Sequence, residues 1–303
     1  MRMKMLCAVL VVIATAQAPI DGISQGLSAS ITAPYRVVPN ITYLTANGFD
    51  AKLDVYARTD QGGPFPTLIW IHGGGWVGGN KESATFSLLP YLEMGWNVVN
   101  VEYRLGRVSL APAAVEDCLC ALRWVIRNAK QYGFDTNKIV TSGGSAGGHL
   151  ALTTALTPAS AGLDRQCPGT EALKVAAVVN WYGITDVADL LEGPNMKDYA
   201  VQWMGSMPNR AEIAKRVSPL TYVRAGAPPV ITIHGDADPT VPYSQATRLQ
   251  EALRKAGVGE QLVTIPGGKH GGFSRAENER AYREIRAFLA KQGLITKQSS
   301  SQE

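Results

Sequence analysis

The feature that most constrains this chain is the pentapeptide Gly-Gly-Ser-Ala-Gly at 143–147, which matches the pattern G-x-S-x-G. A mostly apolar run at 138–141 precedes it, and a helix-forming run at 149–156 follows it. In the order strand, sharp turn, helix, such a motif lifts its serine hydroxyl above the edge of a sheet. The helix N-terminus also favours negative charge beside Ser145. The competing interpretation is a glycine-rich turn with a chance serine, and the rest of the chain decides between them.

Composition indicates an ordinary globular protein. The 303 residues are 46% hydrophobic and 18% charged, and the formal net charge is only +4. Arg248, Arg254 and Lys255 fit a solvated helix face, and no Lys/Arg cluster indicates a surface for nucleic acid. We therefore expect no nucleic-acid partner.

Residues 1–18 have the pattern of a signal peptide. Arg2 and Lys4 form a short positive region, and the apolar run at 6–16 is too short to span a bilayer. Both 14–16 and 16–18 fit the small-x-small cleavage pattern, and Pro19 disfavours the second, so we expect cleavage after Ala16. The alternative is a buried N-terminal helix. We predict a secreted or periplasmic protein without a membrane anchor after cleavage.

Three cysteines remain once Cys7 leaves with the signal: Cys118, Cys120 and Cys167. Export permits either of the first two to pair with Cys167, and buried unpaired thiols fit the sequence equally well. Cys118 and Cys120 point in different directions on a helix, which disfavours a bond between them. Their spacing, without matching histidines, does not predict a metal site, and we expect no metal or cofactor.

Strand and helix patterns alternate along most of the chain. Strands are expected at 36–44, 52–56, 67–71, 97–103, 138–141, 175–181, 229–234 and 261–265, and helices at 81–94, 111–131, 149–156, 244–256 and 277–291. This alternation predicts an α/β fold in one domain at 31–296, with a mostly parallel sheet of about eight strands and helices on both faces. Residues 186–225 interrupt this alternation, and we interpret them as a lid insertion. We expect residues 297–303 to form a flexible tail.

Four polar loops follow predicted strands. They carry the glycines at 73–75, Ser145, Asp238 and His270. Serine needs a neighbouring base, and the imidazole of His270 can take the proton and return it to a leaving alkoxide. Of the four histidines, only His270 follows the acidic loop; the others are His72, His149 and His234. The order Ser, Asp, His resembles the α/β-hydrolase superfamily over nearly all of the predicted mature chain.

That resemblance implies the remaining roles. It places the acid three residues after the glycine of His-Gly, which selects Asp238 over Asp236 to orient the imidazole. It also implies an oxyanion hole made by the backbone N–H groups of Gly74, Gly75 and Ala146.

A narrower resemblance depends on four segments: His-Gly-Gly-Gly-Trp at 72–76, Glu-Tyr-Arg-Leu at 102–105, Pro-Ala-Ala-Val-Glu-Asp at 112–117 and Gly-Ser-Ala-Gly-Gly-His-Leu at 144–150. These look like the hormone-sensitive-lipase-like esterases, and more narrowly like secreted acetyl-xylan and feruloyl esterases. The chain departs from the group at Gly144, where an acidic residue is common, and in having two strands where many members carry a helical cap. Trp76, Trp181, Tyr182 and Trp203 are candidates for the walls of the substrate pocket, although aromatic residues more often form the core.

The resemblance implies a serine carboxylesterase of short-acyl or hydroxycinnamoyl esters, acting through an acyl-enzyme on Ser145, with a small molecule or a polysaccharide as its substrate. Two alternatives stay open. One is an amide-cleaving relative such as an arylformamidase. The other is a non-catalytic binding protein on the same fold, although such proteins tend to lack a triad residue.

Overall fold

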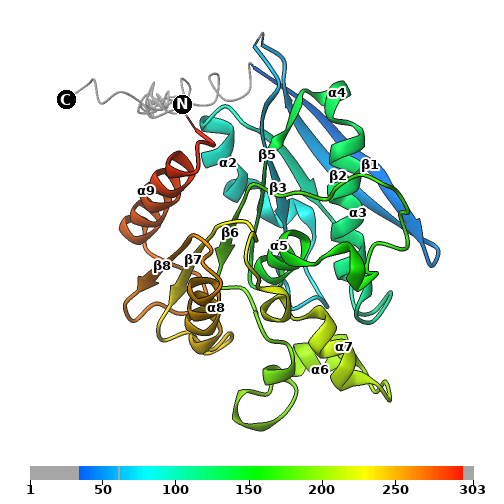
Figure 1. Ribbon diagram of the computed structural model, residues 1–303, viewed down its shortest axis with the longest axis vertical. Helices are drawn as coiled ribbons and strands as arrows, with labels where there is room; N and C mark the ends of the chain where they lie inside the picture. Colours follow the sequence, from blue (N-terminus) through cyan, green and yellow to red (C-terminus); the bar gives the residue numbers. More distant parts are fainter. Residues whose placement is uncertain (1–33, 61, 296–303) are drawn as a thin grey trace, which may run out of the picture.

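The structure is a computed structural model that describes residues 34–60 and 62–295, and the statements below concern those residues. Its centre is an eight-stranded sheet with the order β1-β2-β4-β3-β5-β6-β7-β8 (Figure 1). The strands are β1 (Tyr35–Ala46), β2 (Phe49–Arg58), β3 (Phe65–Ile71), β4 (Asn97–Val101), β5 (Phe134–Gly144), β6 (Ala177–Trp181), β7 (Val230–Gly235) and β8 (Glu260–Ile265). The strands from β4 to β8 in this order run parallel, whereas β1 and β2 form an antiparallel hairpin at one edge. The predicted α/β fold is confirmed.

Alternate residues of the buried strands enter two separate cores. On β3, Ile69 and Ile71 face one core, while Leu68 and Trp70 face the other, because successive side chains of a strand point to opposite faces. The first core is closed by α3 (Ala113–Arg127), α5 (Ala146–Leu156) and α8 (Ser244–Lys255). The second is closed by α2 (Thr85–Glu93) and α9 (Arg275–Lys291). Helices therefore cover both faces of the sheet, which agrees with the continuous apolar runs of its buried strands.

Three segments differ from the sequence-based expectation. The helix expected at 81–94 starts as the 3₁₀ helix η1 (Lys81–Ala84) and continues as α2. The helix expected at 111–131 breaks at Asn128 into α3 and the short α4 (Ala129–Tyr132). The insertion between β6 and β7 is helical rather than irregular. It contains the 3₁₀ helices η3 (Ala188–Leu190), η4 (Gly193–Asn195) and η5 (Pro219–Tyr222), and the helices α6 (Asp198–Met204) and α7 (Arg210–Val217). Its helices are too short to show a clear apolar period.

Of the three cysteines that the structure describes, two form a disulfide and one is a free thiol. Cys120 of α3 is bonded to Cys167 in the loop that follows α5, and Cys118 is buried without a partner among the described residues. The bond packs against the β1–β2 hairpin, beside Leu44 and Ala46.

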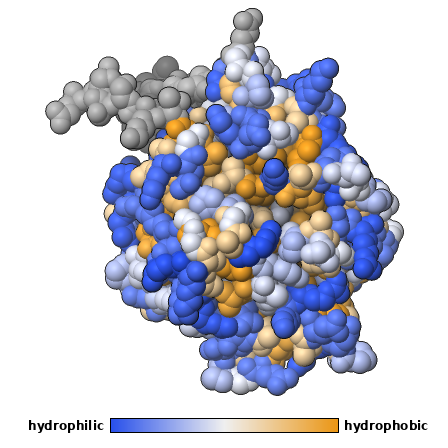
Figure 2. Space-filling model, viewed as in Figure 1, coloured by the Kyte–Doolittle hydropathy of each residue, from blue (hydrophilic) through white to orange (hydrophobic). Residues whose placement is uncertain are grey.

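Polar side chains cover most of the face seen in Figure 2, with apolar patches between them. Within the described part of the chain, none of the helices combines the length and apolarity that crossing a membrane would need. The predicted signal peptide at 1–18 and the tail at 297–303 lie outside the described residues.

Candidate active site

Ser145 occupies the sharp turn between β5 and α5, as the motif predicts. Its backbone is in an unusual conformation, with φ of 58° and ψ of −123°. The turn is tight because the chains touch: a Cβ on Gly143 would lie 2.3 Å from the carbonyl oxygen of Ile71, and one on Gly147 only 2.1 Å from it. Only glycine fits at 143 and 147, and this close approach holds the serine hydroxyl at the carboxyl edge of the sheet.

The structure brings the three predicted triad side chains together. The Ser145 hydroxyl lies 2.8 Å from His270 Nε2, and His270 Nδ1 lies 2.7 Å from Asp238 Oδ2. Asp238 follows β7 and His270 follows β8, so both come from strand ends on the same sheet edge as Ser145. With the proton on Nδ1 donated to the carboxylate, Nε2 is free to accept the serine proton.

Asp238 is held as a carboxylate. Its other oxygen, Oδ1, accepts hydrogen bonds from the backbone N–H groups of Thr240 and Val241 at 2.8 and 2.9 Å. Burial raises the pKa of this carboxyl, but hydrogen bonds from His234, His270 and the Val241 backbone outweigh burial and hold that pKa well below its usual range. Asp238 is therefore ionised at neutral pH.

Asp236 has a different role from Asp238, since its carboxylate bonds to a turn. Its carboxylate accepts a hydrogen bond of 2.6 Å from the backbone N–H of Gly267. Asp236 thus connects the loop at 236–242, which carries Asp238 and which we call the acid loop, to the turn after β8. This agrees with the turn role expected for Asp236.

The glycine loop after β3 presents backbone N–H groups next to Ser145. Gly74 and Gly75 have φ of 113° and 59°, and a Cβ on Gly74 would lie 2.2 Å from the carbonyl oxygen of Gly78. Among the described residues, the backbone N–H groups of Gly74, Gly75 and Ala146 have no hydrogen-bond acceptor. Gly74 and Gly75 line the same cavity as Ser145. These three donors are free for an oxyanion.

Two side chains fix the base of this loop. The Tyr103 hydroxyl donates to the carbonyl oxygen of His72 at 3.0 Å, and the two rings stack with centroids 4.3 Å apart. His72 Nδ1 lies 2.7 Å from the carbonyl oxygen of Gly73, and burial lowers the pKa of His72 to about 4. His72 is therefore neutral at pH 7, so it holds the loop without adding positive charge.

Two of the four aromatic pocket candidates are wrong. Trp76 and Trp203 have no exposed surface and line none of the described cavities near Ser145. Their rings stack with centroids 4.2 Å apart, and Trp76 Nε1 donates to His149 Nδ1 at 3.1 Å. They anchor α6 to the glycine loop because large aromatic rings gain more free energy in a packed core than at a wet wall.

Of the other two candidates, Tyr182 lines the site and Trp181 lines only a cavity beside it. A cavity of about 440 Å³ contains Ser145, His270, the glycine loop and Tyr182. Trp181 lines a smaller neighbouring cavity, which also includes Tyr182. Tyr182 has a positive φ of 40° and packs edge-on against the ring of His270, with centroids 4.8 Å apart.

Three ring-bearing side chains at the site were not predicted as site residues by the sequence analysis. Tyr199 of α6 and Trp70 of β3 line the main cavity, and His234 at the end of β7 lies 3.3 Å from Asp238 Oδ2. Trp70 lies within an apolar run that gives no functional signal. Tyr199 lies within the predicted lid, and His234 immediately precedes the acid loop, so their positions could have marked them.

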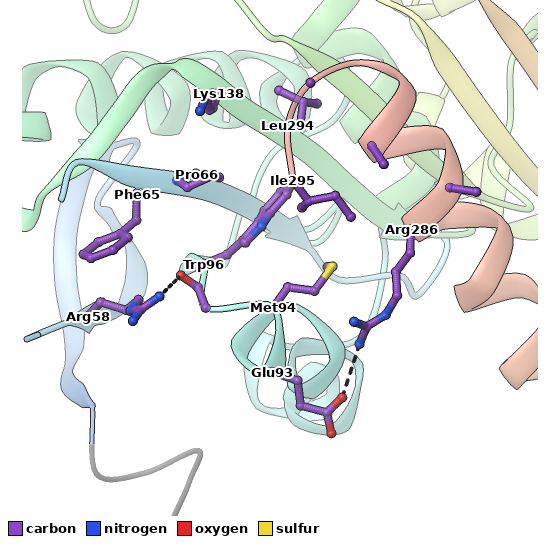
Figure 3. Close-up of a pocket in the computed structure, with 14 residues that line it drawn as sticks. Arg58, Phe65, Pro66, Glu93, Met94, Trp96, Lys138, Arg286, Leu294 and Ile295 are labelled. Carbon is purple, nitrogen blue, oxygen red and sulfur yellow. Dashed lines mark hydrogen bonds and ion pairs between the residues drawn. The ribbon is translucent and has the colours of Figure 1, made fainter. Parts of the chain in front are cut away.

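The largest of the described cavities lies elsewhere (Figure 3). It measures about 870 Å³ and is bounded by the start of β3, the turn before β4 and the end of α9. The cationic side chains that line this cavity each have an acidic partner: Arg58 pairs with Asp60, Arg286 lies 3.5 Å from Glu93, and Lys138 lies 3.9 Å from Asp135. Ligands of parallel α/β sheets bind at the carboxyl ends of the strands, and this cavity lies at the opposite ends.

Comparison with known proteins agrees with this geometry. The profile of the BD-FAE family matches residues 53–253. The chain is 32% identical to Esterase LipQ of Mycobacterium tuberculosis over 74% of this chain and 54% of the relative. It is 35% identical to the probable carboxylic ester hydrolase LipM of the same organism over 67% and 48%. The chain thus spans about half the length of these curated relatives.

Solved structures of esterases are similar to this chain over nearly their whole length. A truncated carbohydrate esterase from gut microbiota superposes with a TM-score of 0.73 at 27% identity, covering 86% of this chain and 98% of that one. Esterase 2 of Thermogutta terrifontis has a TM-score of 0.72 at 28% identity, covering 88% and 95%. The family profile, the shared fold and the clustered Ser145, His270 and Asp238 lead to one conclusion: the chain belongs to the BD-FAE family and has the α/β-hydrolase fold.

Proposed function

We propose that this chain is a serine carboxylesterase and that Ser145, His270 and Asp238 are its catalytic triad. The observation that supports this best is the continuous hydrogen-bonded series from the Ser145 hydroxyl through His270 to Asp238. Beside it are three backbone N–H groups that have no acceptor in the part of the chain that the structure describes. This combination supplies a nucleophile, a base and a site for negative charge within one cavity.

The chemistry proceeds in two halves. His270 Nε2 takes the proton of Ser145 as its oxygen attacks the ester carbonyl, and the N–H groups of Gly74, Gly75 and Ala146 stabilise the resulting oxyanion. His270 then gives this proton to the leaving alkoxide as the C–O bond breaks, which leaves an acyl group on Ser145. A water molecule gives a proton to His270 as its oxygen attacks this acyl group. His270 then returns that proton to the Ser145 oxygen as the bond between this oxygen and the acyl carbon breaks, which releases the acid.

We further propose that the natural ester is a short-acyl or hydroxycinnamoyl ester on carbohydrate, of the acetyl-xylan or feruloyl esterase type. The name of one structural neighbour, a carbohydrate esterase from gut microbiota, supports this choice. The test is a turnover panel: p-nitrophenyl acetate through decanoate, methyl ferulate, acetylated xylan and N-formylkynurenine, with Ser145→Ala as the control. Release of acetate or ferulate that is lost in Ser145→Ala supports the proposal. Preference for the formamide would instead favour an amide-cleaving enzyme, and a folded but inactive protein would favour a binding role.

We propose that the protein is exported. The positive and apolar pattern of residues 1–18 supports this, and so does the Cys120–Cys167 bond, because disulfides persist in oxidising compartments. Intact-mass analysis of the protein from the periplasm or the medium should give a chain that begins at Gln17. A full-length chain that stays in the cytosolic fraction would contradict export.

A further inference from the structure

Asp238 contacts a second histidine besides His270. His234 is the second-to-last residue of β7 and has no exposed surface. Its Nε2 lies 3.3 Å from Asp238 Oδ2, the same oxygen that lies 2.7 Å from His270 Nδ1. One carboxylate oxygen therefore lies between two imidazole rings, and the ring of His270 in turn contacts Ser145.

The surroundings of His234 determine which of its ring nitrogens carries the proton. Nε2 lies 3.0 Å from the carbonyl oxygen of Val241, which can only accept a hydrogen bond, so Nε2 is the donor. Nδ1 is buried without a hydrogen-bond partner among the described residues, so a proton there would have no acceptor. The neutral ring therefore carries its proton on Nε2, where this proton faces Val241 at the shorter distance and Asp238 at the longer one.

The Asp238 carboxylate thus has donors next to both of its oxygens. Oδ1 accepts from the backbone N–H groups of Thr240 and Val241, and Oδ2 faces the N–H groups of His270 and His234. The side chain of Asp238 has no exposed surface, so these donors, rather than bulk solvent, stabilise its charge. Each donor that stabilises the charge makes the carboxylate a weaker base.

Three phenols surround the two histidines. The Tyr182 ring, after β6, packs edge-on against His270 and His234, with centroids 4.8 and 6.5 Å apart. Tyr243, just before α8, packs edge-on against His234 at 5.7 Å, and Tyr199 of α6 contacts the acid loop. Burial raises the pKa of both Tyr182 and Tyr199, and the charge of Asp238 raises each further. Neither of these two phenols therefore changes its charge as the pH falls below neutrality.

Charged side chains on the neighbouring loops bond elsewhere. The Lys197 amine donates to the carbonyl oxygen of Pro239, and the Asp236 carboxylate accepts from a backbone N–H. Lys269 precedes His270 and is exposed. Within the described residues, neither lysine forms an ion pair with Asp238, whereas both histidines lie within ion-pair distance of it.

We propose that His234 is a positioning residue for the reaction, which acts through Asp238. By sharing Asp238 Oδ2 with His270, it reduces the stabilisation that this carboxylate gives to the His270 imidazolium. His270 Nε2 then stays free to accept the Ser145 proton under mildly acidic conditions. This inference rests on the proposed esterase function and adds a residue to its machinery.

The sign of this effect follows from the charges. A general base acts only while it is unprotonated, and an anion next to an imidazole favours the protonated ring. An N–H donor that faces the anion offsets part of its negative potential, so the imidazole binds its proton less tightly. Removal of His234 as a donor should therefore make protonation of His270 easier and shift the loss of activity in acid to higher pH.

The first test removes the donor and keeps a ring. His234→Phe leaves an apolar ring that cannot donate, whereas His234→Gln retains an amide N–H at about the reach of Nε2. Tyr243→Phe is the matched control, because it removes a hydroxyl next to His234 that bonds to Thr264 rather than to Asp238. The readout is kcat/KM for p-nitrophenyl acetate as a function of pH, from pH 5 to pH 9.

We expect the acid limb of this profile to move to higher pH by about 0.5–1 pH unit in His234→Phe, with less than about a tenfold loss at the plateau. His234→Gln should restore at least half of the displacement, and Tyr243→Phe should leave the limb in place. A limb that stays in place in His234→Phe would mean that His234 only closes the acid loop through Val241, and would overturn the inference. An equal displacement in Tyr243→Phe would assign the effect to general loosening and overturn it too.

The second test uses the wild-type chain and does not depend on whether a variant folds. Long-range ¹H–¹⁵N NMR spectra distinguish the two tautomers of each histidine, and the signals of His234 are those that disappear in His234→Gln. At pH 7 we expect the His234 proton on Nε2 and none on Nδ1. A proton on Nδ1 alone would leave Asp238 Oδ2 without this donor and overturn the inference.

The two levels of proposal fail in different ways. NMR titration of the His270 ring follows its protonation without turnover, so it should show the same displacement in His234→Phe as the acid limb. A chain that hydrolyses no ester but shows this displacement would overturn the proposed function and support the link from His234 to His270. An active esterase in which neither the acid limb nor the His270 titration moves in His234→Phe would overturn the inference alone.

Discussion

At the scale of single residues, Asp236 and Asp238 lie two positions apart in one loop and have different surroundings. Asp238 accepts hydrogen bonds from two backbone N–H groups and contacts two histidines, whereas the Asp236 carboxylate accepts a hydrogen bond from the Gly267 backbone in a turn. The first arrangement keeps an imidazole in one orientation, and the second closes a loop.

The first prediction follows from this difference. Asp238→Asn should lower kcat on p-nitrophenyl acetate about 10⁴-fold, because an amide at this position favours the wrong tautomer of His270. Asp236→Asn is the matched control and should change kcat less than about threefold, since one turn contact alone is lost. Steady-state kinetics of both variants check this. The acid assignment would be wrong if Asp236→Asn were the more damaging change.

The second prediction concerns pH and stability. Burial lowers the pKa of His149 to about 4, against 6.5 for the free side chain. As pH falls below about 6.5, the unfolded chain therefore binds a proton that the folded chain does not, and the free energy of unfolding decreases until about pH 4. The expected loss is roughly 3 kcal/mol, at about 1.4 kcal/mol per pKa unit. Burial of His72 acts in the same direction.

Urea unfolding at pH 7.5, 6.0 and 4.5 measures this loss. The slope of unfolding free energy against pH measures how many protons the chain takes up on unfolding, and His149→Gln should lower this number by about one. An unchanged slope in that variant would assign the acid sensitivity to other groups.

The clustering of Ser145, Asp238 and His270 was predictable because each residue follows a recognisable strand and their order is informative. Trp76 and Trp203 were misassigned because sequence alone does not tell an aromatic ring in a core from one in a pocket wall. The contact of His234 with Asp238 was missed because it depends on how the acid loop turns back over β7.

At the scale of elements, α6 connects the two loops that flank Ser145. Tyr199 lies so close to Gly75 that a Cβ on this glycine would be 2.8 Å from it, and its hydroxyl donates to the carbonyl oxygen of Thr240 at 3.1 Å. Lys197, just before the helix, donates to the carbonyl oxygen of Pro239 at 2.9 Å. A single helix of the insertion thus contacts both the glycine loop and the acid loop.

The third prediction tests this connection. Trp203→Ala should cost about 3–5 kcal/mol of stability by leaving a cavity, and it should also lower kcat by loosening the glycine loop through Trp76. Trp96→Ala is the matched control, because Trp96 is 1% exposed but belongs to the second core. Both variants should lose similar stability in urea, yet only Trp203→Ala should lose kcat at 15 °C. Equal kcat in the two variants would show that α6 does not position the loop.

The insertion was the least predictable element. Its position between β6 and β7 was predictable because the alternation of strand and helix patterns stops there. The helices within it were not predictable. The short helix α6 packs through tertiary contacts such as the Trp76–Trp203 stack, which the sequence pattern does not reveal.

At the scale of the whole molecule, the sheet was predictable because its continuous apolar runs alternate with amphipathic helices. The disulfide was not, since either of two cysteines could have paired with Cys167. The choice of Cys120 follows from helix geometry: it faces the hairpin and the loop after α5, whereas Cys118 faces the first core.

The fourth prediction concerns this bond. It links positions separated by 47 residues, and closing a loop of that length in the unfolded chain corresponds to about 4 kcal/mol. Cys120→Ala combined with Cys167→Ala should therefore lower the free energy of unfolding by about 2–4 kcal/mol. Cys118→Ala, which removes one buried sulfur, should cost about 1 kcal/mol. Equal costs would mean that packing, rather than the bond, accounts for the effect.

The spread of the proposed triad along the chain sets an order in time. Ser145 precedes His270 by 125 positions. At a synthesis rate of about 5–20 residues per second, the base is made roughly 6–25 s after the nucleophile. Until β8 joins the sheet, a nascent chain carries a serine with no base to activate it. In the proposed mechanism, ester hydrolysis therefore begins only once β8 has joined the sheet, and regain of activity after dilution from urea would report the docking of β8 and α9.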